Sequence, residues 1–198
     1  MLNPSLWVIG AEGDKEDDTM QTRTEKGGKN SEGPIGTGLV IERRFTTVGE
    51  DPFDQFDWIE MDVEIRNADG SLAHRIDDVR LPSGFSGVAG KVLAQKYLRK
   101  AGVPAILRKV KEKGVPTWLQ RSEPDHEKLQ SLDPEKRFIG ESHGRELFRR
   151  LAGTWTYWGW KHGYFEAEAD ARAYFDEMCY LIASQRSSST FRQSMLLR

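Results

Sequence analysis

Cys179 is the residue of this sequence that could take part in the most kinds of reaction, as a nucleophile or as a radical carrier. It is the chain's one cysteine, so no intramolecular disulfide can form. Its neighbours nevertheless indicate a structural role, because an i, i+3, i+4, i+7 spacing places four side chains on one helix face: Phe175, Met178, Cys179 and Ile182. A free cysteine on such a face behaves as a small apolar side chain, and we interpret Cys179 as part of the core.

No other motif assembles a reactive site. The histidines lack a second His or a Cys at zinc-ligand spacing: His74, His126, His143 and His162. The stretch "GPIGTG" (33–38) has no strand before it, as a dinucleotide loop requires. In "SGFSGVAGK" (83–91), Phe85 and Val92 occupy positions where a phosphate loop needs Gly and Ser or Thr. The sequence therefore predicts no catalytic, cofactor-binding or metal-binding residue.

Aromatic side chains are concentrated in "GTWTYWGWKHGYF", residues 153–165. The candidates for packing or docking are Trp155, Tyr157, Trp158, Trp160, Tyr164 and Phe165. Such a stretch can fill a core, dock on another protein or stack against nucleic-acid bases. We expect it to lie between two helices and pack them together, with part of its surface left for docking.

A basic stretch offers an alternative function. Residues 91–113 carry eight basic residues against one acid, Glu112. With the aromatic stretch 153–165, they would make a small non-catalytic module that binds nucleic acid or a protein. The formal net charge of -2 argues against nucleic acid, since phosphate binding usually accompanies a clear basic excess.

Composition indicates a globular protein. Charged residues make up 30% and hydrophobic residues 37%, and no apolar run approaches the roughly 18 residues of a membrane helix. The start lacks the basic and apolar pattern of a secretory signal, so we expect a cytoplasmic protein with no membrane partner. Residues 1–38 are polar and acidic and end in a glycine-rich run, which predicts a disordered tail.

The remaining pattern predicts an α+β fold, with an N-terminal β-hairpin followed by a mainly helical domain over residues 39–186. "WIEMDVEIRN" (58–67) alternates as a half-buried strand does, and "NADG" leads into a second strand, 71–81. A helix starts near Ser86 and is expected to end at Gly102. Three prolines break the next region into turns and short helices, and Ser142 is the expected cap of another helix.

The clearest helix covers residues 166–184. Its first turns hold Glu166, Glu168 and Asp170, where the helix dipole favours negative charge. The apolar face that includes Cys179 follows directly.

Five blocks resemble the N-terminal region of the class II, adenosylcobalamin-dependent ribonucleotide reductases. In family order they are "ERRFTT" (42–47), "DPFD" (51–54), "LAQKYLRKAGVP" (93–104), "RLAGTWTYWGWKHGYF" (150–165) and "DARAYFDEMCYLIASQR" (170–186). The resemblance implies an enzyme, a ribonucleoside-diphosphate reductase, that makes deoxyribonucleotides for DNA synthesis. It also implies adenosylcobalamin as the cofactor and a cysteine radical inside a large α/β barrel.

The family's chemistry uses three cysteines, and this chain has one. No catalytic or cofactor residue of the family has a matching position, so we expect a truncated chain, without the barrel and inactive alone, that does not bind adenosylcobalamin by itself. Its expected partner is the remainder of the reductase, which would hold the nucleotide substrate and effector. Residues 187–198, "SSSTFRQSMLLR", depart from the family's continuation, and we expect a frameshift or premature stop near Arg186.

Overall fold

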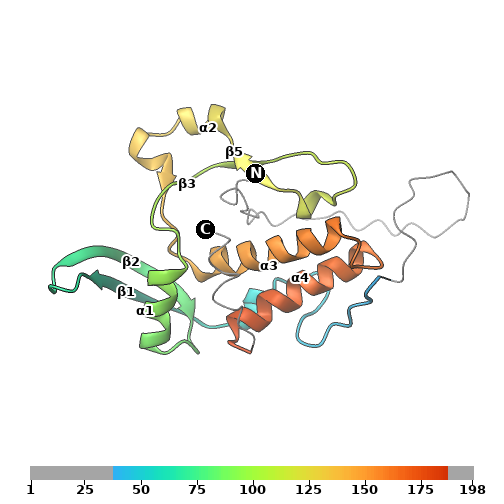
Figure 1. The fold of residues 1–198 in the computed structure, drawn as a ribbon, viewed down its shortest axis with the longest axis horizontal. Helices are drawn as coiled ribbons and strands as arrows, with labels where there is room; N and C mark the ends of the chain where they lie inside the picture. Colours follow the sequence, from blue (N-terminus) through green and yellow to red (C-terminus); the bar gives the residue numbers. More distant parts are fainter. Residues whose placement is uncertain (1–37, 187–198) are drawn as a thin grey trace, which may run out of the picture.

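The computed structural model describes residues 38–186, and two long helices run side by side through it, with a hairpin near one end (Figure 1). Apart from Gly38, the predicted tail 1–38 lies outside the described residues, as does the divergent segment 187–198. Helices are combined with small antiparallel sheets, which confirms the predicted α+β class.

The hairpin consists of β1 (Trp58–Arg66) and β2 (Leu72–Pro82), which pair antiparallel. Gly70 takes a φ of +85° in the connecting turn, a left-handed conformation that glycine adopts without steric cost. Val63 is buried as its alternation predicts, whereas Ile59 near the strand's start is exposed. The hairpin therefore turns only part of its apolar face to the core.

Helix α1 (Gly87–Lys96) lies against the hairpin. The Oγ of Ser86 accepts a hydrogen bond from the Ala89 backbone N–H, which caps the helix start. Gly90 allows close contact, because a Cβ there would lie 2.7 Å from the Sδ of Met61. The predicted end at Gly102 is wrong: α1 stops earlier, and Gly102 turns the chain with a φ of +79°.

Between α1 and α3 the chain forms short elements that the sequence predicted only in part. The expected short helices are η3 (Thr117–Leu119), α2 (His126–Gln130) and η4 (Pro134–Lys136). Two antiparallel pairs were not expected: β3 (Val103–Pro104) with β6 (Phe138–Ile139), and β4 (Leu107–Lys109) with β5 (Ser122–Pro124). Strands of two or three residues are too short to show a readable alternation.

Helix α3 (Gly144–Lys161) corrects two expectations. Its N-cap is His143 rather than Ser142: His143 Nδ1 accepts from the Arg145 backbone N–H at 3.1 Å. The aromatic stretch does not lie between two helices, because residues 153–161 form the last turns of α3. Gly159 lies inside the helix, where a Cβ would come within 2.7 Å of the Phe165 ring.

Helix α4 (Glu168–Ala183) lies against α3 (Figure 1) and buries Phe175 and Cys179 as predicted. The core joins the hairpin, α1, α3, α4 and the short helix η2 (Pro52–Gln55). Its buried members include Phe53, Val63, Val79, Leu81, Leu93, Phe148, Leu151, Phe175 and Cys179. Within residues 38–186, every helix is too short or too polar to span a bilayer.

Candidate functional site

The predicted packing and docking residues all lie at the C-terminal end of α3 or directly after it: Trp155, Tyr157, Trp158, Trp160, Tyr164 and Phe165. These six side chains differ in what they contact. Trp155 packs against the core, while Trp158 and Tyr164 remain 41% and 59% exposed. The other members bind a loop or pack on α4.

Two of these aromatic side chains hold the loop around Glu112. The Tyr157 hydroxyl donates to the Glu112 carboxylate at 2.8 Å, and Lys161 Nζ donates to it at 2.6 Å. Trp160 Nε1 donates to the carbonyl of Gly114 at 2.6 Å. The hydrogen bond from Lys161 lowers the pKa of Glu112, whereas burial and the bond to Glu112 raise the pKa of Tyr157 to about 12. Near neutral pH the phenol is therefore the donor and the carboxylate the acceptor.

Tyr164, one of the two exposed aromatic residues, adjoins a segment far away in the sequence. Leu39 N–H donates to the Tyr164 carbonyl at 2.7 Å, and the His162 ring lies 5.9 Å from the Tyr164 ring. Leu39 and Val40 are themselves exposed. We call Trp158, Tyr164, Leu39 and Val40 the aromatic patch. All four of its side chains are apolar and exposed.

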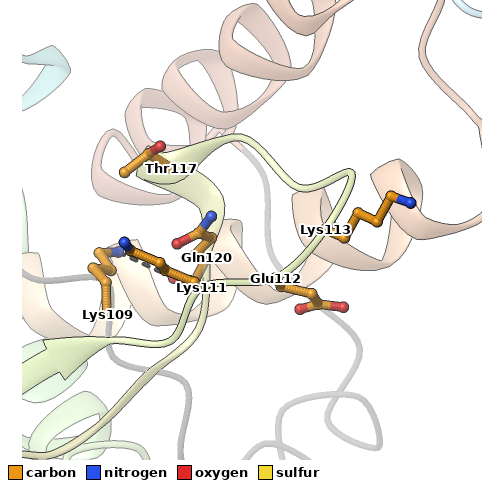
Figure 2. Close-up of a pocket in the computed structure, with 6 residues that line it drawn as sticks. All are labelled: Lys109, Lys111, Glu112, Lys113, Thr117 and Gln120. Atoms are coloured by element: carbon orange, nitrogen blue, oxygen red, sulfur yellow. Dashed lines mark hydrogen bonds between the residues drawn. The ribbon is translucent and has the colours of Figure 1, made fainter.

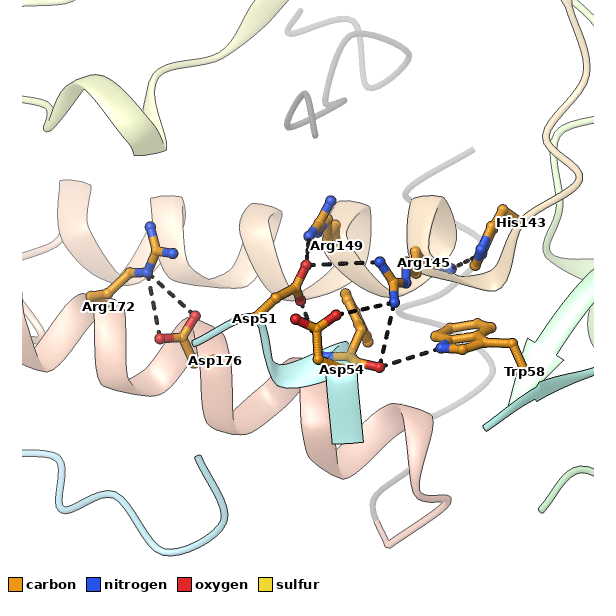
Figure 3. Close-up of polar contacts among 9 residues, drawn as sticks. Asp51, Asp54, Trp58, His143, Arg145, Arg149, Arg172 and Asp176 are labelled. Atoms are coloured by element: carbon orange, nitrogen blue, oxygen red, sulfur yellow. Dashed lines mark hydrogen bonds and ion pairs between the residues drawn. The ribbon is translucent and has the colours of Figure 1, made fainter. Parts of the chain in front are cut away.

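A polar cluster fixes η2 on α3 (Figure 3). Asp51 forms an ion pair with Arg149, and Arg145 reaches Asp54 at 3.4 Å. The Arg145 guanidinium also lies over the Trp58 ring, 5.0 Å from its centroid. Every charge in this cluster has a partner on a neighbouring element, so the cluster stabilises the packing of η2 against α3.

Two acidic side chains of α4 bind the extended segment that precedes η2. Asp176 is 2% exposed and pairs with Arg43 at 2.8 Å and with Arg172 on its own helix. The Glu177 carboxylate accepts three backbone N–H groups, those of residues 44–46, at 2.9 to 3.1 Å. Sequence reasoning missed both roles. The available signal was a pair of acids beside an apolar helix face, with arginines in "ERRFTT" to match them.

A second buried ion pair joins α3 to the strand region before it. Arg150 donates from Nη2 to Glu141 at 2.9 Å and to the Tyr97 carbonyl at 3.0 Å. Glu141 also accepts from the Arg99 backbone N–H at 2.9 Å. Both side chains of the ion pair are 2% exposed.

The titratable side chains with catalytic potential have structural positions. Cys179 is fully buried, and burial raises the pKa of its thiol, so the nucleophilic thiolate is disfavoured. Burial and nearby arginines lower the pKa of His143 to about 4, which keeps it a neutral hydrogen-bond acceptor. Residues 38–186 contain no cluster of three His, Cys, Asp or Glu side chains suited to a metal.

The basic stretch 91–113 is divided between α1, β4 and the following loop. Arg108 pairs with Glu123 at 2.6 Å, and Lys109 donates to two backbone carbonyls. Tyr157 and Trp160 hold the nearby loop instead of presenting a shared stacking surface. This arrangement does not favour a nucleic-acid-binding surface made by the whole basic stretch.

Residues 60–185 match the protein family described as class II vitamin B12-dependent ribonucleotide reductase. A relative from Bradyrhizobium diazoefficiens, named vitamin B12-dependent ribonucleotide reductase, is 50% identical over 147 residues. One of the same name from Agrobacterium fabrum is 49% identical over 148 residues, and one from Streptomyces avermitilis is 29% identical over 160. The matches cover 74%, 75% and 80% of this chain. The chain belongs to the class II vitamin B12-dependent ribonucleotide reductase family.

The relatives are much longer proteins. The matched region spans 12% of the Bradyrhizobium and Agrobacterium proteins and 13% of the Streptomyces protein. The family match and the identities with these relatives confirm the family resemblance found in the sequence blocks.

The recess beside Lys109 and the buried Cys179 do not fit a cobalamin. Ligand sites enclose most of the ligand, whereas the recess beside Lys109 and Lys111 (Figure 2) is shallow and open and holds about 410 Å³. Cys179 is enclosed in the core and cannot meet a cofactor there. We therefore assign no step of cofactor chemistry to residues 38–186.

Proposed function

We propose that this chain forms the N-terminal part of a vitamin B12-dependent ribonucleotide reductase and serves that enzyme as a docking and bracing domain. The complete enzyme would reduce ribonucleotides to deoxyribonucleotides for DNA synthesis, with adenosylcobalamin held by the remainder of the protein. The observation that carries the proposal is the family match over residues 60–185.

The geometry favours a structural role for this chain over a catalytic one. Cys179, the chain's one thiol, is buried in the core. In each of the two buried ion pairs, the arginine pairs with a carboxylate of the protein itself. The aromatic patch is the part of the predicted site left open, through Trp158 and Tyr164. The remainder of the reductase, with its barrel, is the partner we propose for this patch.

The proposal also concerns the chain alone. Residues 1–198 by themselves hold one cysteine, whereas the family's chemistry uses three, so we expect them neither to reduce ribonucleotides nor to bind adenosylcobalamin tightly. Incubation of the purified chain with ribonucleotides, adenosylcobalamin and a dithiol should yield no deoxyribonucleotide. Turnover above a cobalamin-free control would contradict this part of the proposal.

A chimera tests the docking role. Residues 39–186 of this chain would replace the matching segment of the Bradyrhizobium relative, with which the chain shares 50% identity. The chimera should reduce ribonucleotides, and Trp158→Ser with Tyr164→Ser should impair its activity and its thermal stability. Leu72→Ser, at an exposed apolar position on the hairpin, is the matched control. Equal behaviour of the patch variant and the control would refute docking through this patch.

A further inference from the structure

Strand β1 forms one edge of the hairpin, and no strand within residues 38–186 pairs with that edge. The hairpin is a sheet of two strands, and the described backbone hydrogen bonds of β1 run to β2 alone. We propose that the free edge of β1 accepts an extended segment from the remainder of the reductase, in which apolar residues alternate with Lys or Arg. The source of this segment rests on the proposed function, whereas the properties of the edge do not.

The edge of β1 is long and regular. The strand covers nine residues, and both irregularities of its pairing place the extra residue on β2. Between Met61 and Val63 the register advances two residues on β1 and three on β2, where Asp78 takes a left-handed φ of +54°. Proteins usually shorten, bulge or cover an exposed edge, because its unpaired N–H and C=O groups invite another strand. β1 itself has no bulge, so its outward N–H and C=O groups follow the regular spacing that another strand needs.

The other edge of the hairpin is already in contact with the chain. The Arg80 N–H of β2 donates to the Ser142 carbonyl at 2.9 Å, and Arg80 also forms a bridge with His143, the N-cap of α3. Figure 1 shows the hairpin extending outward near the start of α3, whereas Trp158 of the aromatic patch lies in the last turns of that helix. A segment on the β1 edge would therefore make a second contact with the enzyme, at the opposite end of α3 from the aromatic patch.

One face of β1 offers apolar contacts to such a segment. Val63 and Ile65 are buried there, Met61 is half-buried, and Ile59 is 39% exposed. Residues two apart in a strand share a face, so an adjacent strand would lay every second side chain beside these residues. Apolar side chains at those positions would extend the core over Ile59 and Met61 and remove apolar surface from water.

The other face of β1 selects for positive charge. It carries Glu60, Asp62 and Glu64, which are 41% to 53% exposed, and Arg66 at its end. The arginines that pair with these acids from β2 lie on the side away from the open edge. Side chains directly opposite each other on adjacent strands interact, and opposite charges are favoured over like charges. A segment beside β1 should therefore carry Lys or Arg at positions that alternate with its apolar residues.

A second copy of this chain matches the edge less well. Antiparallel pairing of two β1 strands over their full length would set Glu60 opposite Glu64 and Asp62 opposite its own copy, and like charges in such positions destabilise a sheet. The relatives are much longer than this chain, whose matched region spans 12% of two of them. Most of such a protein is therefore available to supply the segment, and linkage in one polypeptide raises its effective concentration.

A short blocked peptide of alternating valine and lysine, added to the 198-residue chain, tests the edge. Binding should saturate and should slow hydrogen exchange at every second amide of residues 58–66, because only alternate N–H groups point outward from an edge strand. Glu60→Gln with Glu64→Gln should weaken the Kd of the peptide about fivefold. Glu50→Gln with Glu135→Gln, two exposed acids outside the hairpin, is the matched control and should leave the Kd unchanged.

Three results would overturn the proposal. The first is equal binding of a peptide of alternating valine and glutamate. The second is binding without slower exchange at alternate amides of β1, which would show a charge contact in place of strand addition. The third is a dimer of the chain whose β1 amides are protected in the absence of peptide, which would assign the edge to a second copy.

The chimera with the Bradyrhizobium relative tests the source of the segment. Glu60→Gln with Glu64→Gln should lower the Tm of the chimera more than that of the isolated chain, where exposed ion pairs contribute little. Equal shifts of Tm in the two proteins would overturn the assignment to the remainder of the reductase. An inactive parent chimera would instead count against the proposed function, while its Tm shift and the peptide still report on the edge.

Discussion

The Phe165 ring lies directly against the backbone of Gly159, so that a Cβ added at Gly159 would come within 2.7 Å of the ring's Cε2. The same glycine accepts a hydrogen bond through its carbonyl from the Tyr164 N–H at 2.9 Å. The turn from α3 into α4 is thus closed onto a helix position without a side chain. This contact explains why a glycine interrupts the aromatic stretch.

Replacement of Gly159 by Ala should destabilise the protein, although alanine is the better helix former by about 1 kcal/mol. The added methyl meets the Phe165 ring, and overpacking of this kind costs about 1–3 kcal/mol. Urea denaturation would measure the change. A matched Gly159→Ala, Phe165→Leu double variant should recover part of the loss, and a single variant more stable than the parent would contradict the contact.

Trp155 and Trp158 should respond differently to truncation. Trp155 packs against the core, so Trp155→Ala should cost about 3 kcal/mol of unfolding free energy. Trp158 is 41% exposed, so Trp158→Ala should cost less than about 1 kcal/mol. Parallel denaturant melts would compare them. Similar losses for the two variants would show that the assignment of core and surface is wrong.

Removal of one partner from the Arg150–Glu141 pair should be severe. Arg150→Met leaves the Glu141 carboxylate buried without its ion-pair partner, and breaking such a pair costs about 3–5 kcal/mol. Arg150→Met combined with Glu141→Leu should be less destabilised, because no charge is then stranded. Chemical denaturation of both variants and the parent measures the difference, and an additive double variant would argue against direct pairing.

The N-cap of α3 should make stability depend on pH. Burial and the charges of Arg145, Arg80 and Arg149 lower the pKa of His143 to about 4, against about 6.5 in an unfolded chain. Between these values the unfolded state binds more protons, so stability should fall as pH drops from about 6.5 to about 4.

His143→Asn is the matched variant for this effect, since asparagine is a good N-cap and does not titrate. The parent should lose stability relative to the variant over that pH window. NMR titration of the His143 ring should give a pKa well below 6.5. A pKa near 6.5, or parallel pH profiles for the two proteins, would refute the coupling.

Periodic patterns determined the larger elements from sequence alone. Strict alternation specified β1, and the i, i+3, i+4 spacing specified the buried face of α4 with Cys179 on it. The helix start near Ser86 was readable from the helical spacing of the apolar residues that follow it, and the structure shows that Ser86 caps this helix. These features depend on neighbours within a few residues, which is why a sequence pattern contains them.

The tertiary structure alone decided the roles of individual side chains. Whether an aromatic ring packs, anchors a loop or stays exposed depends on what folds against it, as Trp155, Trp160 and Trp158 show. Asp176 and Glu177 are buried because a segment more than a hundred residues earlier supplies Arg43 and three backbone donors. Such partners are distant in sequence and have no fixed spacing, so their pairing emerges only when the chain has folded.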